Sequence, residues 1–187
     1  ITKGWTGDVK YHMGASYTHD SGLNVKLAYN PSHLEVGNPL VIGSVRAAQD
    51  DTSEPGVAKH DPSSAMGIVL HGDAAFAGQG IVTEGFNFSQ TAGFKTGGTV
   101  QIIANNMIGF TTELHDSRSS NYSSDPAKGY DIPVIHVNAD SPETVAAVGR
   151  FVAAYRAKFK KDIVIDLIGY RRYGHNETDD PTVTNPE

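Results

Sequence analysis

The sequence has 187 residues, of which 39% are hydrophobic and 19% are charged, and its formal net charge is −6 at pH 7. That length supports a full domain with a sizeable core, and the composition is ordinary for a globular protein. The acidic balance argues against a nucleic-acid partner, and no apolar run approaches the roughly 18–20 residues that cross a membrane. The lack of cysteine excludes a disulfide framework or a thiolate metal site and is compatible with a reducing compartment.

The first third of the chain is mostly polar, with two segments that predict regular structure. Residues 4–20 are Gly-rich and predict a long loop, whereas residues 24–29 alternate between apolar and polar side chains as a short strand does. Asn38-Pro39 resembles an N-cap followed by proline at the first helical position, so we expect a helix to begin there. Residues 50–65 combine Asp, Ser, Pro, Gly and His without a period and predict a surface loop.

Two continuous apolar runs in the middle of the chain predict buried parallel strands. They cover residues 66–70 and 99–104. Between them, residues 78–80 predict a tight turn and residues 81–91 a helix. The segment between the two strands can form one helix, so the strands can lie adjacent and parallel in one sheet.

The C-terminal part continues the alternation. Residues 111–130 form a polar stretch, and a loop of that length without structure is uncommon unless it has a function. Residues 134–137 predict a strand, Asp140 and Glu143 resemble a capping box at the start of a helix, and residues 163–168 predict a last buried strand. This alternation predicts an α/β fold, a three-layer parallel sheet with helices on both faces.

Each central strand ends at a side chain that carries oxygen. Asp73 follows the first strand and Asn106 follows the second, 33 residues later. Two adjacent parallel strands would deliver both side chains to the carboxyl edge of the sheet, where ligands bind in α/β folds. Mg²⁺ prefers such oxygen ligands and shares them with substrate phosphates. The alternative is that Asp73 caps the next helix and Asn106 satisfies a turn, and the spacing alone favours this alternative.

Other site signatures are absent from the sequence. No G-x-G-x-x-G follows a strand, and no G-x-x-x-x-G-K-[ST], G-x-S-x-G or H-E-x-x-H occurs. A hydrolytic triad assembled through space stays open with little support. We expect His71 and His136, which lie in strands, to be hydrogen-bonded structural residues. His12, His33 and His175 lie in loops, where a functional role is more common.

The sequence around Asp73 resembles the thiamine diphosphate motif of the transketolase superfamily, Gly-Asp-Gly followed later by Asn-Asn, with Ala74 in place of the second Gly. Residues 71–80, with the sequence HGDAAFAGQG, resemble more narrowly the thiamine-dependent decarboxylating component of the 2-oxoglutarate dehydrogenases. Four further segments resemble that family in the same order along the chain: residues 7–12, 30–35, 105–110 and 170–177.

The resemblance implies a transketolase-like fold and the cofactors thiamine diphosphate and Mg²⁺. It implies oxidative decarboxylation of 2-oxoglutarate in the tricarboxylic acid cycle. The succinyl group would pass to lipoamide on the lipoyl domain of the dihydrolipoyl succinyltransferase. Members of this family are homodimers of the bacterial cytoplasm or the mitochondrial matrix. Because the chain runs from Ile1, without Met, to loop-like sequence at Glu187, we expect residues 1–187 to be a single diphosphate- and Mg-binding domain within a longer multidomain chain.

The resemblance also implies roles for individual residues. Mg²⁺ would be held by Asp73, Asn106 and the carbonyl of Ile108. The remaining cofactor contacts would come from Leu34, near the pyrimidine, and from the backbone of Ala74 and Ala75, near the diphosphate. The 2-oxo acid would contact His12, the expected catalytic residue, and Ser32.

Two family elements are missing from this stretch, and two rival functions stay open. A His-Arg-Gly-Arg segment and the glutamate that activates the aminopyrimidine are not in the sequence, so we expect the isolated segment to bind cofactor weakly and not to turn over. The nearest rival is the 2-oxoadipate dehydrogenase relative, although Lys10-Tyr11-His12 favours the 2-oxoglutarate form. The other rival is a non-catalytic α/β domain that binds a ligand or partner, and the intact Asp73/Asn106 pair argues against it.

Overall fold

A four-stranded parallel sheet forms the centre of the protein. The structure is a computed structural model and describes residues 12–110, 112–171 and 180. The strand order is β5-β6-β10-β9, and each neighbouring pair is parallel. The four strands are β5 (Gly67–Gly72), β6 (Thr99–Asn105), β10 (Ile163–Ile168) and β9 (Val134–Asn138). The four strand predictions are therefore confirmed within two residues at each end, and the α/β class with them.

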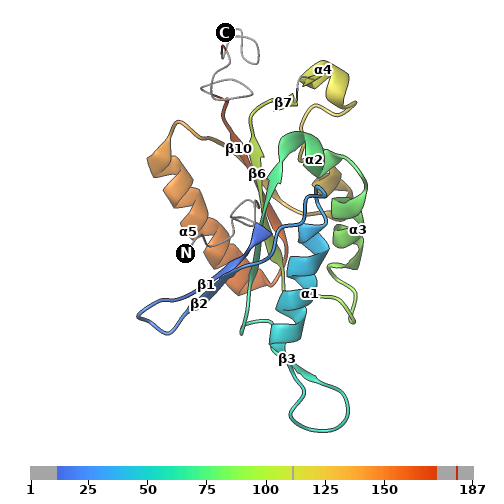
Figure 1. Cartoon of the computed structure of the whole chain (residues 1–187), viewed down its shortest axis with the longest axis vertical. Coiled ribbons are helices and arrows are strands. Elements are labelled where there is room, and N and C mark those ends of the chain that lie inside the picture. Colours follow the sequence, from blue (N-terminus) through green and yellow to red (C-terminus); the bar gives the residue numbers. More distant parts are fainter. Residues whose placement is uncertain (1–11, 111, 172–179, 181–187) are drawn as a thin grey trace, which may run out of the picture.

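Helices lie on both sides of this sheet (Figure 1). One face is covered by α5 (Pro142–Phe159), and the other by α1 (Gly37–Gln49) and α3 (Ile81–Phe88). The short helix α2 (Asp73–Ala77) continues directly from β5 at the carboxyl end of the strands. Among the described residues, no helix is long and apolar enough to cross a membrane.

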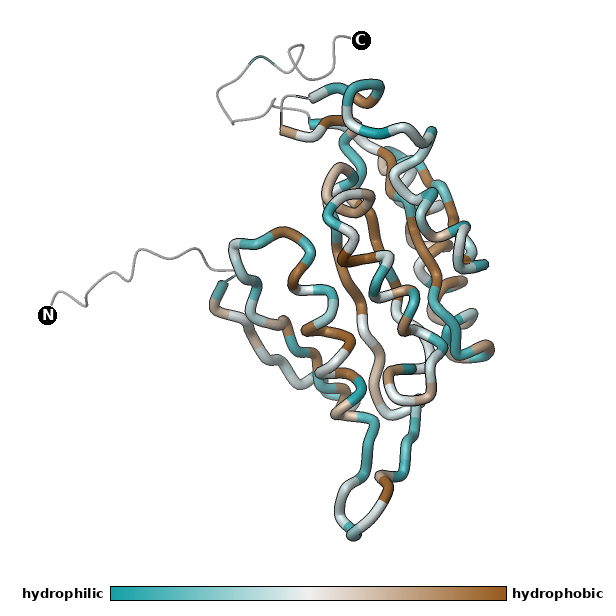
Figure 2. The backbone as a smooth tube through the Cα atoms, turned by 90° about the vertical axis from the view of Figure 1, so that its right-hand side faces the viewer, coloured by the Kyte–Doolittle hydropathy of each residue, from teal (hydrophilic) through white to brown (hydrophobic). Residues whose placement is uncertain are grey.

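Alternate residues along the buried strands serve two separate cores. Ile103 and Val164 face the cluster that contains Phe76 and Phe86 of α2 and α3. The neighbouring positions on the strands face α5 and pack against Val152. Figure 2 shows the apolar stretches gathered along the strands of the sheet. This division into two cores is what fixes the sheet between its helical layers.

The remaining elements are short and lie outside the main sheet. The first hairpin pairs β1 (Ala15–Thr18) with β2 (Asn24–Leu27), and two smaller ladders pair β3 with β4 and β7 with β8. The other bounds are β3 (Asp50–Asp51), β4 (Lys59–His60), β7 (Ile108–Gly109), β8 (Thr112–Glu113), α4 (Leu114–Ser117) and the 3₁₀ helix η2 (Asp125–Tyr130). Thus β1 lies in a stretch expected to be a loop, and the polar stretch 111–130 contains three short elements.

Both predicted helix caps differ from the structure. Ser141, and not Asp140, precedes the first residue of α5, and no side chain makes a capping hydrogen bond there. Asp140 instead donates its backbone N–H to the side chain of Asn138 at the end of β9, which holds it in a turn. Asn38 lies one residue inside α1, is buried, and accepts a hydrogen bond from Gln101 Nε2. A local backbone hydrogen bond thus holds Asp140 outside the helix, and a long-range contact to Gln101 engages the Asn38 side chain.

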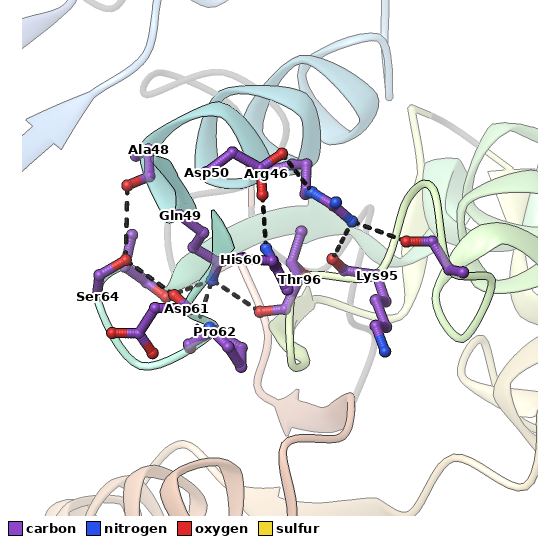
Figure 3. Close-up of polar contacts among 12 residues, drawn as sticks. Arg46, Ala48, Gln49, Asp50, His60, Asp61, Pro62, Ser64, Lys95 and Thr96 are labelled. Carbon is purple, nitrogen blue, oxygen red and sulfur yellow. Dashed lines mark hydrogen bonds and ion pairs between the residues drawn. The ribbon is translucent and has the colours of Figure 1, made fainter. Parts of the chain in front are cut away.

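The amino end of the sheet is closed by a cluster of side chains that bind backbone carbonyls (Figure 3). Gln49 Nε2 lies within hydrogen-bonding distance of the carbonyls of Ala65 and Thr96, each at 2.8 Å. Nearby, Asp50 accepts from Arg46 Nε and pairs with His60 Nδ1, each at 2.8 Å. These contacts fix the two ends of the segment 50–65 near the start of β5 and β6, whereas residues 51–57 between them are exposed, as expected of a surface loop.

Candidate metal centre

The candidate centre lies where β5 and β6 end side by side. The two strands are parallel, and Gly72 pairs with Ala104. Asp73 therefore emerges as the first residue of α2, while Asn106 follows the end of β6 on the neighbouring strand. The predicted meeting of an acid and an amide at the carboxyl edge of the sheet is confirmed. The alternative role of Asp73 as a helix cap is not found, because Gly72 occupies the capping position.

Three oxygen-bearing groups converge at this point. In one orientation the Asn106 amide donates to Asp73 Oδ1 at 3.1 Å and to the Ile108 carbonyl at 2.9 Å. A half-turn of the amide places its oxygen at the same point, where it faces the other two oxygens. Three converging oxygens repel one another unless a cation lies between them. The arrangement therefore fits a hard divalent ion such as Mg²⁺.

The turn between β6 and β7 supplies this geometry. Met107 adopts a left-handed conformation, with φ of 61°, and its N–H donates to the side chain of Asn105. The chain thereby reverses so that the Ile108 carbonyl points back toward Asp73 and Asn106. Among the described residues no group of three His, Cys, Asp or Glu side chains converges. A metal at this edge of the sheet would therefore depend on the amide and carbonyl oxygens beside the single carboxylate.

Asp73 itself is held in an unusual environment. Only 3% of the residue is exposed, and its Oδ2 has no hydrogen-bond partner within the described part of the chain. Burial raises the pKa of the Asp73 carboxyl, although backbone hydrogen bonds and the positive charge of Arg118 act in the opposite direction. A buried carboxylate with one unsatisfied oxygen is costly on its own and is stabilised by a nearby cation.

The first asparagine of the pair, Asn105, has different neighbours from Asn106. Asn105 is buried and donates its Nδ2 to Asp166 Oδ1 at 2.9 Å, and His136 Nδ1 lies 2.8 Å from the other Asp166 oxygen. Asp166 is fully buried, so these two hydrogen bonds connect β6, β10 and β9 near their carboxyl ends. The expectation that His136 is a hydrogen-bonded structural residue is confirmed.

His71 ties the segment before α1 to the end of β5. Its Nδ1 lies 2.5 Å from Glu35 Oε2, and its Nε2 lies 2.6 Å from Gln101 Oε1. Its structural role is therefore confirmed as well. Glu35 adopts a left-handed φ of 68°, so the buried contact holds the chain in a conformation that a glutamate rarely adopts. Leu34, next to it, is 65% exposed, and Ser32 is exposed too.

The β1–β2 hairpin relates the two residues predicted to bind substrate. Ala15 pairs with Leu27, so the residues before β1 and after β2 leave the hairpin at the same end. His12 lies before β1 and is half-buried, and Ser32 lies after β2. The hairpin therefore brings the two segments that carry these residues, 20 positions apart in the sequence, to the same end of the β1–β2 pair. The predicted loop residue His175 lies outside the described residues.

One charged side chain beside the centre was not singled out from the sequence. Arg118 Nη1 lies 3.8 Å from Asp73 Oδ2, and the Arg118 side chain is only 9% exposed. It borders a cavity of about 470 Å³ between α2 and the segment that follows α4. The sequence feature that could have indicated Arg118 is the unusual length of the polar stretch 111–130. That length indicates a functional segment but does not identify which of its residues is functional.

Comparisons with known proteins identify the family of the chain. The family model of the dehydrogenase E1 component matches residues 1–187. A 2-oxoglutarate dehydrogenase E1 component from Geobacillus sp. (strain WCH70) is 60% identical over 190 residues, covering 100% of this chain and 20% of the relative. The same component from Geobacillus kaustophilus (strain HTA426) is 59% identical, and that from Exiguobacterium sp. (strain ATCC BAA-1283 / AT1b) is 57% identical, each with the same coverage. The chain thus spans a fifth of the length of these relatives and belongs to the dehydrogenase E1 component family.

Proposed function

We propose that this chain is the diphosphate- and Mg-binding domain of a thiamine diphosphate-dependent 2-oxoglutarate dehydrogenase, with residues 1–187 forming one domain of a longer, homodimeric enzyme. The dehydrogenase E1 family uses thiamine diphosphate, and the relatives reported above carry the name of the 2-oxoglutarate enzyme. The observation that carries the proposal is the convergence of Asp73, Asn106 and the Ile108 carbonyl at the edge of the sheet. The fold is proposed to be transketolase-like.

The reaction proposed for the whole enzyme is the oxidative decarboxylation of 2-oxoglutarate, a step of the tricarboxylic acid cycle. The succinyl group would be transferred to the lipoyl domain of a dihydrolipoyl succinyltransferase. Bound thiamine diphosphate would supply the carbon nucleophile and the electron sink that the loss of CO₂ requires. We place the enzyme in the cytoplasm if its source is bacterial and in the mitochondrial matrix if it is eukaryotic.

The residues at the strand ends would hold the metal and the diphosphate. Asp73 Oδ1, Asn106 Oδ1 and the Ile108 carbonyl would bind Mg²⁺, leaving the other coordination positions for phosphate and water oxygens. Ala74 and Ala75, at the start of α2, would let the backbone approach the diphosphate, because their side chains are small. The nearly complete burial of Asp73 would strengthen its attraction for the metal.

The residues around the β1–β2 hairpin would bind the organic part of the site. Leu34 would pack on the pyrimidine ring, which would cover a side chain that is 65% exposed in this structure. His12 would donate a hydrogen bond to the carboxylate of the 2-oxo acid or, when protonated, neutralise its charge. Ser32 would donate its hydroxyl to the same substrate. The pairing of Ala15 with Leu27 supports a common location for these residues.

Removing the Asp73 carboxylate in the full-length enzyme tests the metal assignment. We expect Asp73→Ala to weaken Mg²⁺-dependent binding of thiamine diphosphate by more than the roughly 10- to 100-fold that loss of an outer-shell partner costs. Decarboxylation of 2-oxoglutarate should fall with it. Isothermal titration with and without Mg²⁺ measures the binding. Glu54→Ala is the control, because Glu54 is an exposed acid in the loop between β3 and β4, at the amino end of the sheet. Unchanged Mg²⁺-dependent binding in Asp73→Ala would overturn the assignment.

A further inference from the structure

Arg118 is a buried cation with donors that stay unsatisfied. Its side chain is 9% exposed, and neither Nε nor Nη1 has a hydrogen-bond acceptor among the described residues. The 3.8 Å separation between Nη1 and Asp73 Oδ2 is an ion pair but exceeds hydrogen-bonding distance. Burying a guanidinium group costs free energy unless its N–H groups meet acceptors. The environment of Arg118 therefore fits an anion with several oxygens.

The cavity that Arg118 borders has room for such an anion. Its volume is about 470 Å³. One wall comes from small residues of α2 and the turn after it, and the other from hydroxyl-bearing residues on either side of Arg118. The lining residues are Ala74, Ala77, Gly78, Ser117, Arg118, Ser119, Ser120, Asp125 and Pro126. The Asp125 carboxylate is paired with Lys128 Nζ at 2.6 Å, so its negative charge is already balanced.

The two oxygens of Asp73 face two different cationic positions. Oδ1 faces Asn106 and the candidate metal centre, while Oδ2 faces Arg118. A divalent ion and a guanidinium group on either side of one carboxylate leave a net positive charge. An anion that reached both would balance this charge, and a diphosphate carries several negative charges along its length. The planar fork of arginine also matches the spacing of phosphoryl oxygens.

We propose that Arg118 forms a phosphoryl subsite of the cofactor site, in which its guanidinium group binds an oxygen of the diphosphate while the Asp73 centre holds the Mg²⁺ bound to the same group. This inference rests on the proposed function, because it assigns the anion to the diphosphate of thiamine diphosphate. Arg118 is then a cofactor-binding residue of this family member. The hydroxyl groups of Ser119 and Ser120 line the same cavity and are available to donate to the remaining oxygens.

Two substitutions in the full-length enzyme test the subsite by direct binding. We expect Arg118→Gln to weaken Mg²⁺-dependent binding of thiamine diphosphate by roughly 10- to 100-fold, the range for loss of a charge-assisted hydrogen bond. Arg118→Lys keeps the charge without the planar fork and should lose less. Inorganic pyrophosphate should compete with the cofactor in the wild type, and its own affinity should fall by a similar factor in Arg118→Gln. Isothermal titration gives the dissociation constant of the cofactor for all three proteins and that of pyrophosphate for the wild type and Arg118→Gln.

The controls separate this inference from the proposed function. Arg150→Gln makes the same charge change on an exposed position of α5 and should bind as the wild type does. If the wild type itself binds no thiamine diphosphate with Mg²⁺, the proposed function fails. If the wild type binds and both Arg118 variants bind equally well, the subsite is overturned. Pyrophosphate that binds through Arg118 without displacing the cofactor overturns it too. If circular dichroism shows that Arg118→Gln does not fold, the affinity of Arg118→Lys tests the subsite instead. Weaker cofactor binding than in the wild type supports the subsite, and equal binding overturns it.

Discussion

Two neighbouring residues at the end of β6, Asn105 and Asn106, make different kinds of contact. Of the two consecutive asparagines, Asn105 donates to the buried Asp166 and is committed to the sheet. Asn106 is turned toward Asp73 and the Ile108 carbonyl and is available to a ligand. The left-handed Met107 separates the two roles by reversing the chain just after them. An Asn-Asn pair at the end of one strand can therefore fix the sheet with its first residue and present an oxygen with its second.

How much of the site the sequence predicts depends on whether its residues follow strands. The meeting of Asp73 and Asn106 follows from two apolar runs and the geometry of parallel strands, so it was predictable. The position of Arg118 beside Asp73 was not predictable, because it depends on how the polar stretch 111–130 folds over α2. That stretch has no periodic pattern from which its fold could be predicted. The contact between His71 and Glu35 was missed for the same reason, since it joins segments 36 residues apart through side chains alone.

Gly98 is a residue whose size is fixed by the backbone around it. Its φ is +89°, and a Cβ at this position would overlap the carbonyl group of Lys161. We expect Gly98→Ala to destabilise the start of β6 by more than the roughly 1–3 kcal/mol that backbone strain alone costs. Hydrogen–deuterium exchange of peptides from β6 and β10 in the full-length enzyme measures this loss.

Gly149→Ala is the matched control for Gly98→Ala. Gly149 lies inside α5, and nothing stands within 4 Å of a Cβ built there. Alanine in a helix interior is favoured over glycine by roughly 0.5–1 kcal/mol, so this variant should be as stable as the wild type or more so. Equal exchange rates in the wild type and in Gly98→Ala would contradict the steric argument.

At the scale of whole elements, the sheet is tied to its helical layers by long side chains that bind backbone carbonyls. Gln49 at the end of α1 and Arg156 near the end of α5 both bind the carbonyls of Ala65 and Thr96, from opposite faces of the sheet. Arg156 Nε also donates to the Gly98 carbonyl at 3.1 Å. The two helices are thus connected through the segments that precede β5 and β6.

Arg156→Met tests this connection. Arg156 is 4% exposed, and the substitution removes three hydrogen bonds to carbonyls that stay buried. We expect a loss of roughly 3 kcal/mol, since a hydrogen bond to a charged group contributes roughly 1.5–3 kcal/mol and the cost of burying the charge offsets part of the sum. Hydrogen–deuterium exchange of peptides from β5 and β6 should be faster in Arg156→Met than in the wild type. Arg150→Met on the exposed side of the same helix should leave it unchanged, and similar exchange in both variants would argue against the tether.

The elements themselves were predictable in proportion to how apolar they are. The strands at 66–70, 99–104, 134–137 and 163–168 are confirmed because buried parallel strands form continuous apolar runs. The helix α2 was missed, since five residues that follow a strand directly carry too little periodicity to indicate a helix. The capping box at Asp140 was wrong because Asn138 accepts the Asp140 N–H and the helix begins two residues later. Local hydrogen bonds of this kind decide helix ends and leave no pattern in the sequence.

At the scale of the whole molecule, apolar side chains lie exposed on one side of the sheet and on the hairpin. Ile68 and Leu70 of β5 are 48% and 71% exposed, and Leu27 and Tyr29 at the end of the hairpin are 59% and 74% exposed. Ile68 and Leu70 lie on the opposite face of β5 from Val69 and His71, which are buried. Large apolar side chains exposed on a sheet face in this way are typical of surface that other protein or ligand covers. In the longer enzyme proposed above, further parts of the chain would be available to cover these side chains.

The isolated segment should therefore differ from the full-length enzyme in cofactor binding. The proposed metal centre uses residues of this chain alone, but Leu34, the proposed contact of the pyrimidine ring, is 65% exposed. Burial of a ring-sized apolar group is worth roughly 2–3 kcal/mol. We expect residues 1–187 alone to bind thiamine diphosphate with Mg²⁺ at least roughly 30-fold more weakly than the full-length enzyme and to release no CO₂ from 2-oxoglutarate. Parallel isothermal titrations of the two proteins measure the difference. Equal affinities would mean that the segment contains every important cofactor contact and would contradict the division of the site between this domain and the rest of the enzyme.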